Sequence, residues 1–192
     1  MKSDIIIISN DGKGMEEALA QAEKTAQYKA LPPKAALHLR LLTEEMLGMM
    51  RSITGEKEGR FWIEDQENVF QLHLQVKTQM DFDKEEKLLA ASTSGKNEAA
   101  KGIMGRIRAF FDPMDWASAP VPVHPDSSNT MLTWSMNSYR KQVKEDLEQE
   151  QEGAAEAWDE LEKSVVSNLA DEVKVSIKGW DVEMIIYKRT GA

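Results

Sequence analysis

Two adjacent carboxylates, Glu44 and Glu45, stand in a stretch whose other residues are mostly apolar. A carboxylate held on a helix can act as a general base, because it accepts a proton from a hydroxyl group or from water. The ordinary interpretation is that both acids point to solvent. The alternative is that one of them lines a binding or catalytic site. The predicted secondary structure around them is needed to choose between these two interpretations.

A second group of residues could bind an anion. It combines cations with glycines and comprises Lys96, Lys101, Gly102, Gly105 and Arg106. Backbone N–H groups at the start of a helix attract phosphate, and neighbouring cations strengthen that attraction. An ordinary amphipathic helix over Glu98–Phe111 is the other interpretation of this segment.

Other site chemistries are excluded or disfavoured by composition. The chain has no cysteine, and its three histidines (His38, His73 and His124) lie far apart, so we expect no metal site. His73 falls on the polar side of its strand and is expected to be solvated. A net charge of −9 argues against nucleic-acid binding. The apolar run Ile5–Ile8 is far shorter than the ~20 residues of a membrane span, so we expect a cytoplasmic protein.

The two carboxylates belong to a predicted helix over Ala35–Ile53. Pro33 suits its first turn, and Gly55 follows its end. Further apolar residues widen its apolar stripe, so we expect burial on two sides; they are Leu37, Leu41, Leu47 and Met50. The stripe itself recurs every three or four residues and consists of Ala35, Leu39, Leu42, Met46, Met49 and Ile53.

Strands are predicted on both sides of this helix. Ile5–Ile8 reads as a strand buried on both faces, and a helix is predicted over Gly14–Tyr28. Phe61–Ile63 and Val69–Val76 form a predicted hairpin, with a tight turn over Asp65–Asn68. A second hairpin closes the chain, with alternating apolar residues at positions 173–177 and 182–186.

The region between the hairpins is predicted to be mostly helical. Prolines exclude regular structure from Asp112–Ser128, and helix is expected again over Met131–Ala170, with Gly153 as a joint. Nine acids and no Lys or Arg occupy the segment Glu145–Glu162. A solvated helix face is the ordinary interpretation, and a docking surface for a basic partner is the alternative.

These elements predict an α+β fold in one domain over residues 1–192. We expect a two-layer sandwich, with helices on one face of a mixed, mostly antiparallel sheet. Residues 81–157 would form a helical insertion within this domain.

The predicted central helix and the hairpin after it, LRLLTEEMLGMMRSITG and two strands, resemble the first motif of the histidine-kinase-type ATPases (the Bergerat fold). The chain is most similar to the anti-sigma-factor serine kinases. The ending LEKSVVSNLADEVKVSIKGWDVEMIIYKR also resembles the last helix and closing hairpin of that family. The resemblance implies an ATP site with Mg²⁺, in which a helical Glu acts as the base.

The motifs of that family are degenerate here. Glu45 matches the general base, but the residue four positions on, an Mg²⁺-binding Asn in the family, is Met49. A thioether is a poor ligand for a hard cation. The Asp of the adenine-reading Asp-x-Gly-x-Gly motif corresponds to Thr78, and both glycines are missing. Counting back from Asp171 places the phosphate loop of the family on Glu160–Glu162, where carboxylates would repel phosphate. The alternative is the segment from Lys101 to Arg106.

Three classes of function remain. The first is a regulatory protein that acts through protein–protein interaction, like an anti-sigma factor without the kinase step, with a protein partner or a second copy of the chain. We expect no resident cofactor in that case. The second is an active ATP-binding protein or serine kinase that uses Glu45 as base, with Lys96, Lys101 or Arg106 on the phosphates. The third is a binder of a small apolar ligand beside Met46, Met49 and Met50.

Overall fold

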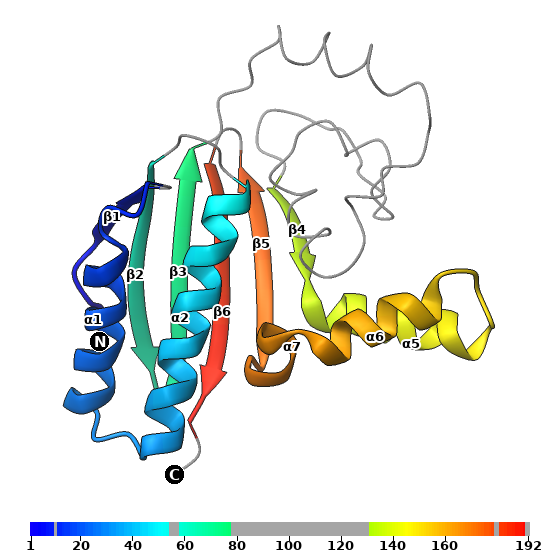
Figure 1. Ribbon diagram of the computed structural model, residues 1–192, viewed down its shortest axis with the longest axis horizontal. Coiled ribbons are helices and arrows are strands. Elements are labelled where there is room, and N and C mark those ends of the chain that lie inside the picture. Colours follow the sequence, from blue (N-terminus) through cyan, green and yellow to red (C-terminus); the bar gives the residue numbers. More distant parts are fainter. Residues whose placement is uncertain (10, 54–57, 78–130, 179–180, 191–192) are drawn as a thin grey trace, which may run out of the picture.

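A six-stranded antiparallel sheet forms the centre of the computed structural model (Figure 1). The structure describes residues 1–9, 11–53, 58–77, 131–178 and 181–190. The sheet order is β1-β2-β3-β6-β5-β4. Every pair of neighbouring strands is antiparallel, so the mixed sheet expected from the sequence is wrong for the described strands. The strands are β1 (Ile6–Ser9), β2 (Glu58–Gln66), β3 (Val69–Lys77), β4 (Met131–Ser135), β5 (Glu172–Lys178) and β6 (Asp181–Arg189).

One face of the sheet carries the hydrophobic core. The pairing Phe61↔Leu74↔Met184↔Val175 aligns four apolar side chains across neighbouring strands. Residues paired directly across antiparallel strands point to the same face, so the alternation along each strand puts the apolar set on one side. All four side chains are at most 1% exposed.

The helices α1 (Met15–Tyr28) and α2 (Pro33–Ile53) pack against that apolar face and against each other (Figure 1). Leu39, Leu42 and Met46 on α2 are fully buried, as the stripe predicted. Leu37 is 53% exposed, so the expected burial on two sides is wrong at this position. Leu37 lies on the outward ridge of α2 with Arg40, Glu44 and Gly48, where no described element covers it.

A turn beside β1 depends on a glycine. Gly14 has φ +76°, a backbone conformation that L residues rarely adopt. A Cβ atom built there would lie 2.1 Å from the carbonyl oxygen of Ile7. This close approach lets α1 start directly against β1.

β1 differs from the prediction of a strand buried on both faces. It pairs only with β2, so it is an edge strand. Ile8 faces the core and is fully buried, whereas Ile7 is 47% exposed on the other face. The run of four isoleucines therefore reflects a strand with one buried face, and Ile5 lies outside the strand at 51% exposure.

The hairpins were predicted correctly, with small shifts of boundary. Glu67 and Asn68 form the β2–β3 turn, both at positive φ, which matches the right-handed twist of the strands. β5 and β6 form the C-terminal hairpin. Phe61, Leu74 and Met184 of the two hairpins face the helices, whereas Trp62 and Ile185 lie on the other face of the sheet.

The remaining helices leave the sheet and form an arm (Figure 1). α5 (Met136–Glu148) and α6 (Ala154–Lys163) pack on each other and extend sideways from the β4 end, and α7 (Val165–Leu169) returns the chain to α2. Gly153 is the N-cap of α6 at φ +82°, which confirms it as the joint. The prediction of helix from Met131 is wrong, because Met131–Ser135 is β4, paired with β5.

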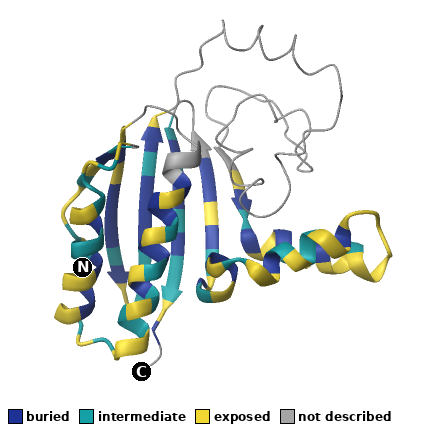
Figure 2. Cartoon of the chain, viewed as in Figure 1, coloured by how far each residue is buried: buried dark blue, intermediate teal, exposed yellow. Residues whose placement is uncertain are grey.

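The described part of the chain is thus a two-layer α/β sandwich with helices on one face. Burial follows this division, with dark blue along the faces where helices meet the sheet and yellow along the arm (Figure 2). Among the described helices, none is both long and apolar enough to cross a bilayer. Residues 81–157 contain β4, α5 and the start of α6, so the expected helical insertion also contributes a strand to the sheet.

Candidate functional site

Of the residues predicted to form a site, the structure describes Glu45 and Met49, which lie in the second half of α2. One edge of the sandwich is at the upper end in Figure 1. Lys77, Asp181, Lys178 and Met131 are paired across four neighbouring strands at this edge. The C-terminal end of α2 lies there too. The described chain stops at Lys77 and resumes at Met131.

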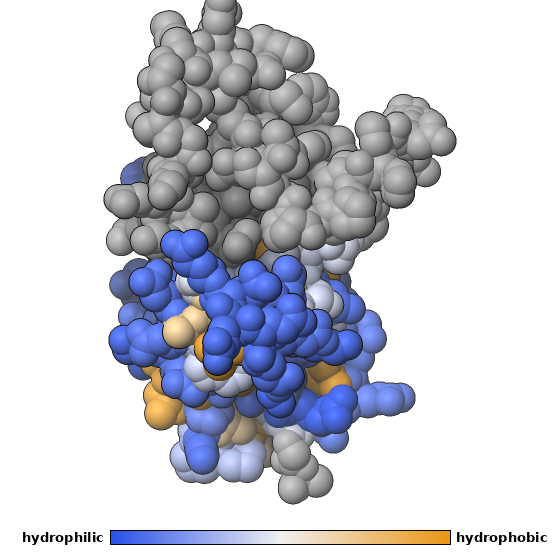
Figure 3. Space-filling model, turned by 90° about the vertical axis from the view of Figure 1, so that its right-hand side faces the viewer, coloured by the Kyte–Doolittle hydropathy of each residue, from blue (hydrophilic) through white to orange (hydrophobic). Residues whose placement is uncertain are grey.

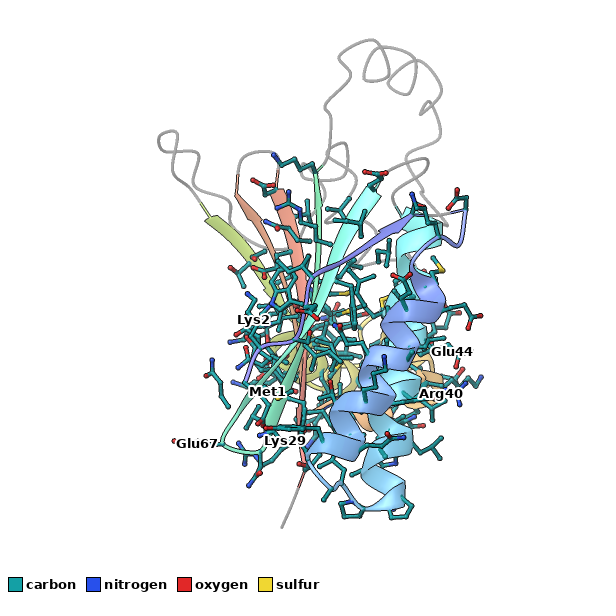
Figure 4. All side chains as sticks on the ribbon, turned by 90° about the vertical axis from the view of Figure 1, so that its left-hand side faces the viewer. Met1, Lys2, Lys29, Arg40, Glu44 and Glu67 are labelled. Atoms are coloured by element: carbon teal, nitrogen blue, oxygen red, sulfur yellow. The ribbon has the colours of Figure 1, made fainter. Side chains whose placement is uncertain are left out.

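Glu45 lies on α2, two turns before the helix ends. Its side chain is half-buried and makes no hydrogen bond or ion pair with another described residue. Glu44, the neighbouring carboxylate, is exposed on the outer side of α2, where Figure 4 shows it close to Arg40. Of the two acids, only Glu45 is partly buried.

Met49 follows Glu45 by one helical turn and is fully buried. It belongs to the same hydrophobic cluster as Leu42, Met46 and the core side chains of the sheet. Packing against the sheet accounts for an apolar residue at this position. The position that the family resemblance assigns to an Mg²⁺ ligand is therefore occupied by a core side chain.

The other predicted site residues lie outside the described residues. They are Thr78, Lys96, Lys101, Gly102, Gly105 and Arg106, together with the predicted helix Glu98–Phe111 and the proline-rich segment Asp112–Ser128. The structure neither joins them to Glu45 nor separates them from it.

The described residues around Glu45 do not fit a magnesium–nucleotide site. Mg²⁺ takes oxygen ligands in near-octahedral geometry, and the position beside Glu45 offers a buried thioether. Within the described ranges, no group of three or more acidic or histidine side chains could hold a metal ion.

His38 lies two helical turns before Glu45 on the same flank of α2. Its partial burial lowers the pKa of the imidazole, and the positive charges of Lys188 and Lys34 lower it further. The neutral form of this histidine is therefore favoured at the base of the helix layer. It makes no ion pair with a described acid, and it is too far along the helix to share a metal ion with Glu45.

The arm carries most of the acidic segment. Its nine acids are exposed except Asp146 and Glu160, which are half-buried. Two of them pair with a lysine one turn away, Glu145 with Lys141 and Asp159 with Lys163. In the view of Figure 3, which looks at the molecule from the side of the arm, the described surface is mostly hydrophilic.

Residues on the opposite face of the sheet form a cluster that the sequence did not predict. The His73 imidazole stacks on the Trp62 indole, with ring centroids 4.7 Å apart and planes 10° apart. His73 Nδ1 lies 2.9 Å from Glu183 Oε1. His73 is only 7% exposed, so its expected solvation is wrong. Its partner, Glu183, lies 110 residues further along the sequence, and the alternation within one strand cannot predict such a long-range contact.

A shallow groove of about 310 Å³ lies between α1 and α2, away from Glu45. Small apolar side chains line it, among them Ala26, Ala30 and Leu31, and the ion pair of Glu23 with Arg40 borders it. Met46 and Met49 are packed in the core and do not line it.

Comparisons with protein-family models, with curated proteins and with solved structures found no match to this chain.

Proposed function

We propose that the chain is a regulatory protein with a histidine-kinase-like ATPase fold, that its nucleotide site is degenerate, and that it acts by binding a protein partner. The complete burial of Met49 supports this proposal best. A metal ligand at that position has been replaced by a core residue. Phosphoryl transfer depends on metal ions that neutralise charge on the phosphates, so this loss alone removes most of the catalysis.

The acidic arm is the surface that we propose for the partner. It projects from the sandwich, and its acids greatly outnumber the cations beside them. A partner with a basic surface would associate rapidly with it, and the association would weaken as salt screens the charges. The proposed activity is thus recognition of a basic protein surface without a chemical step.

One observation favours a second candidate, an active ATP-binding protein. Glu45 is a half-buried carboxylate without a side-chain partner among the described residues. Catalytic bases are often left in this condition when the substrate is absent. This candidate requires that oxygen ligands for Mg²⁺ come from residues other than Met49.

Thermal unfolding with millimolar ATP or ADP, with and without Mg²⁺, separates the two candidates. A ligand at ~100 times its dissociation constant would add about 2.7 kcal/mol to the free energy of unfolding. We expect no Mg²⁺-dependent stabilisation. Mg²⁺-dependent stabilisation would support the active ATP-binding protein instead, and ATP hydrolysis that is lost in Glu45→Gln but kept in Glu44→Gln would then identify Glu45 as its base. The two substitutions make the same change on adjacent residues of α2.

The partner itself is tested by affinity isolation with three versions of the chain. An arm variant carries Glu148→Lys, Glu150→Lys and Glu152→Lys. A control variant reverses exposed acids away from the arm, Glu16→Lys and Glu17→Lys on α1. We expect one protein to be retained by the wild type and the control but not by the arm variant. Equal retention by all three would contradict a role for the arm.

A further inference from the structure

The face of the sheet opposite the helices is covered by no described element (Figure 4). Its middle carries a row of apolar and aromatic side chains that crosses neighbouring strands. The pairing Trp62↔His73↔Ile185 forms the centre of this row on β2, β3 and β6. Ile7 on β1 extends it toward the sheet edge, because its partner Arg60 points to the same face.

The row is hydrophobic in the place where a solvated sheet face is usually polar. Ile7 is 47% exposed and Ile5 is 51% exposed, so aliphatic surface next to Trp62 is left in contact with water. The Lys2 ammonium lies 4.7 Å from the centroid of the Trp62 ring. Trp62 and His73 themselves are only 8% and 7% exposed, so the apolar surface in contact with water on this face is mainly that of Ile5 and Ile7.

Charge sets this face apart from the rest of the molecule. The whole chain has a net charge of −9, and acids dominate the arm. On the open face, the described charged side chains balance each other. The bases are Lys2, Arg60, Lys77, Lys174 and Arg189, and the acids are Glu58, Glu64, Glu172, Asp181 and Glu183.

Because positive and negative charges are equal in number on this face, two copies of it can bind each other without net electrostatic repulsion, although the whole chain is acidic. In a two-fold dimer each base on one copy can lie opposite an acid on the other, because an isologous interface uses the same patch twice. Two sheets that pack face to face lie about 10 Å apart, and their side chains interdigitate. The central apolar row would form the interior of such an interface.

The size of the face is also sufficient. Five neighbouring strands, about 4.8 Å apart and about seven residues long at about 3.3 Å per residue, cover roughly 550 Å². Two copies would bury roughly 1,100 Å² in total, just above the ~1,000 Å² that a specific interface needs.

Pairing through the edge of β1 is a poorer alternative. The turn that ends at Gly14 approaches the carbonyl oxygen of Ile7 so closely that even a Cβ would not fit. Backbone groups of β1 are thereby partly covered on the outer side. The face is more accessible than the edge.

From these observations we infer that the open sheet face, centred on Ile7, Trp62, His73 and Ile185, is the interface between two copies of this chain. This inference is independent of the nucleotide site and of the acidic arm. A homodimer that uses this face leaves α2 and the arm accessible to a different partner.

Sedimentation equilibrium of the full chain at about 1–200 µM tests the inference. The decisive variant is Ile7→Arg, which puts a charge in the proposed interface at a half-exposed position. The matched control is Leu37→Arg, because Leu37 is similarly exposed on α2 on the opposite side of the sheet. Both variants add one positive charge, and thermal unfolding will verify that both are folded.

We expect the wild type and Leu37→Arg to dimerise alike, and the dissociation constant of Ile7→Arg to rise at least about tenfold. A monomeric wild type over the whole range would overturn the inference. A dimer that Ile7→Arg does not weaken, or that both variants weaken equally, would overturn it as well.

A second measurement does not depend on how well Ile7→Arg folds. Because the chain has no cysteine, a single engineered thiol can be cross-linked selectively. Gln71→Cys, on β3 within the open face, should give a covalent dimer with a short bis-maleimide, whereas Leu37→Cys should not. Equal cross-linking of the two variants would contradict the proposed interface.

Discussion

Gly14 shows how one residue fixes the start of the fold. An alanine there would have to adopt φ +76° with its Cβ at 2.1 Å from the Ile7 carbonyl oxygen. We expect Gly14→Ala to lower the free energy of unfolding by at least about 2 kcal/mol. Gly48→Ala is the control, because Gly48 lies within α2 with open space around it, and it should stabilise by about 0.5–1 kcal/mol. Urea unfolding measures both, and a harmless Gly14→Ala would contradict the geometry of the turn.

Glu64 links the same region to pH. The hydrogen bond from the Lys2 ammonium lowers the pKa of this carboxyl group, and the bond from the Trp62 indole N–H lowers it further. A carboxyl group whose pKa is lower in the folded state stabilises the fold above its unfolded pKa, ordinarily 4.5. That stabilisation is lost as the pH falls through the lower, folded value.

Glu64→Gln should therefore destabilise the protein at pH 7, by less than about 1 kcal/mol for a pair near the surface. The difference from the wild type should shrink as the pH falls below 4.5. Urea unfolding at several pH values measures it, with Glu67→Gln in the exposed β2–β3 turn as control. A difference that stays constant across this pH range would show that the ion pair is not its cause.

At the scale of elements, the junction between β4 and α5 depends on a helix N-cap whose hydrogen bonds connect β4, α5 and β5. Ser135 Oγ accepts a hydrogen bond from the Ser138 backbone N–H and donates one to Glu172 Oε2. Glu172 Oε1 accepts the Asn137 backbone N–H, so β5 also holds the first turn of the arm. The arm is thereby attached to the sheet at its base.

Ser135→Ala removes both of these bonds and should cost about 1 kcal/mol, the usual value for an N-cap. Ser138→Ala is the control, because Ser138 is exposed in the first turn of the same helix and uses only its backbone in the cap. Thermal unfolding compares the two variants. Equal effects would mean that helix propensity, and not the cap, determines the result.

The same junction shows what the sequence could and could not predict. The stripes of α1 and α2 and the alternation in both hairpins were strong enough to predict these elements nearly at their boundaries. β4 was missed, because a run of five residues, MLTWS, has no clear period and its pairing partner β5 lies about 40 residues further on. Ser135 ends the strand and caps the helix, and this was the local signal of the change.

At the scale of the whole molecule, the two-layer arrangement follows from sequence pattern, but the surfaces do not. Alternation places His73 on the polar side of β3, yet its burial depends on Trp62 and Glu183 from two other strands. Ile5–Ile8 reads as a doubly buried strand, yet its position at the sheet edge leaves one side uncovered. Such features depend on long-range strand order, which local periodicity does not encode.

The candidate site divides in the same way. The sequence predicted that Glu45 and Met49 share one side of a helix, and the structure places both on α2, with Met49 in the core. The residues predicted to bind phosphate and adenine lie outside the described ranges. The central claim, that the chain has lost nucleotide chemistry, therefore depends mainly on Met49.

Calorimetric titration of the wild-type chain with ATP in the presence of Mg²⁺ tests that claim most directly. Our account predicts no heat beyond dilution up to millimolar nucleotide, with and without Mg²⁺. A saturable heat that requires Mg²⁺, with a dissociation constant in the micromolar range, would contradict it. The chain would then be an ATP-binding protein whose metal ligands lie elsewhere than on α2.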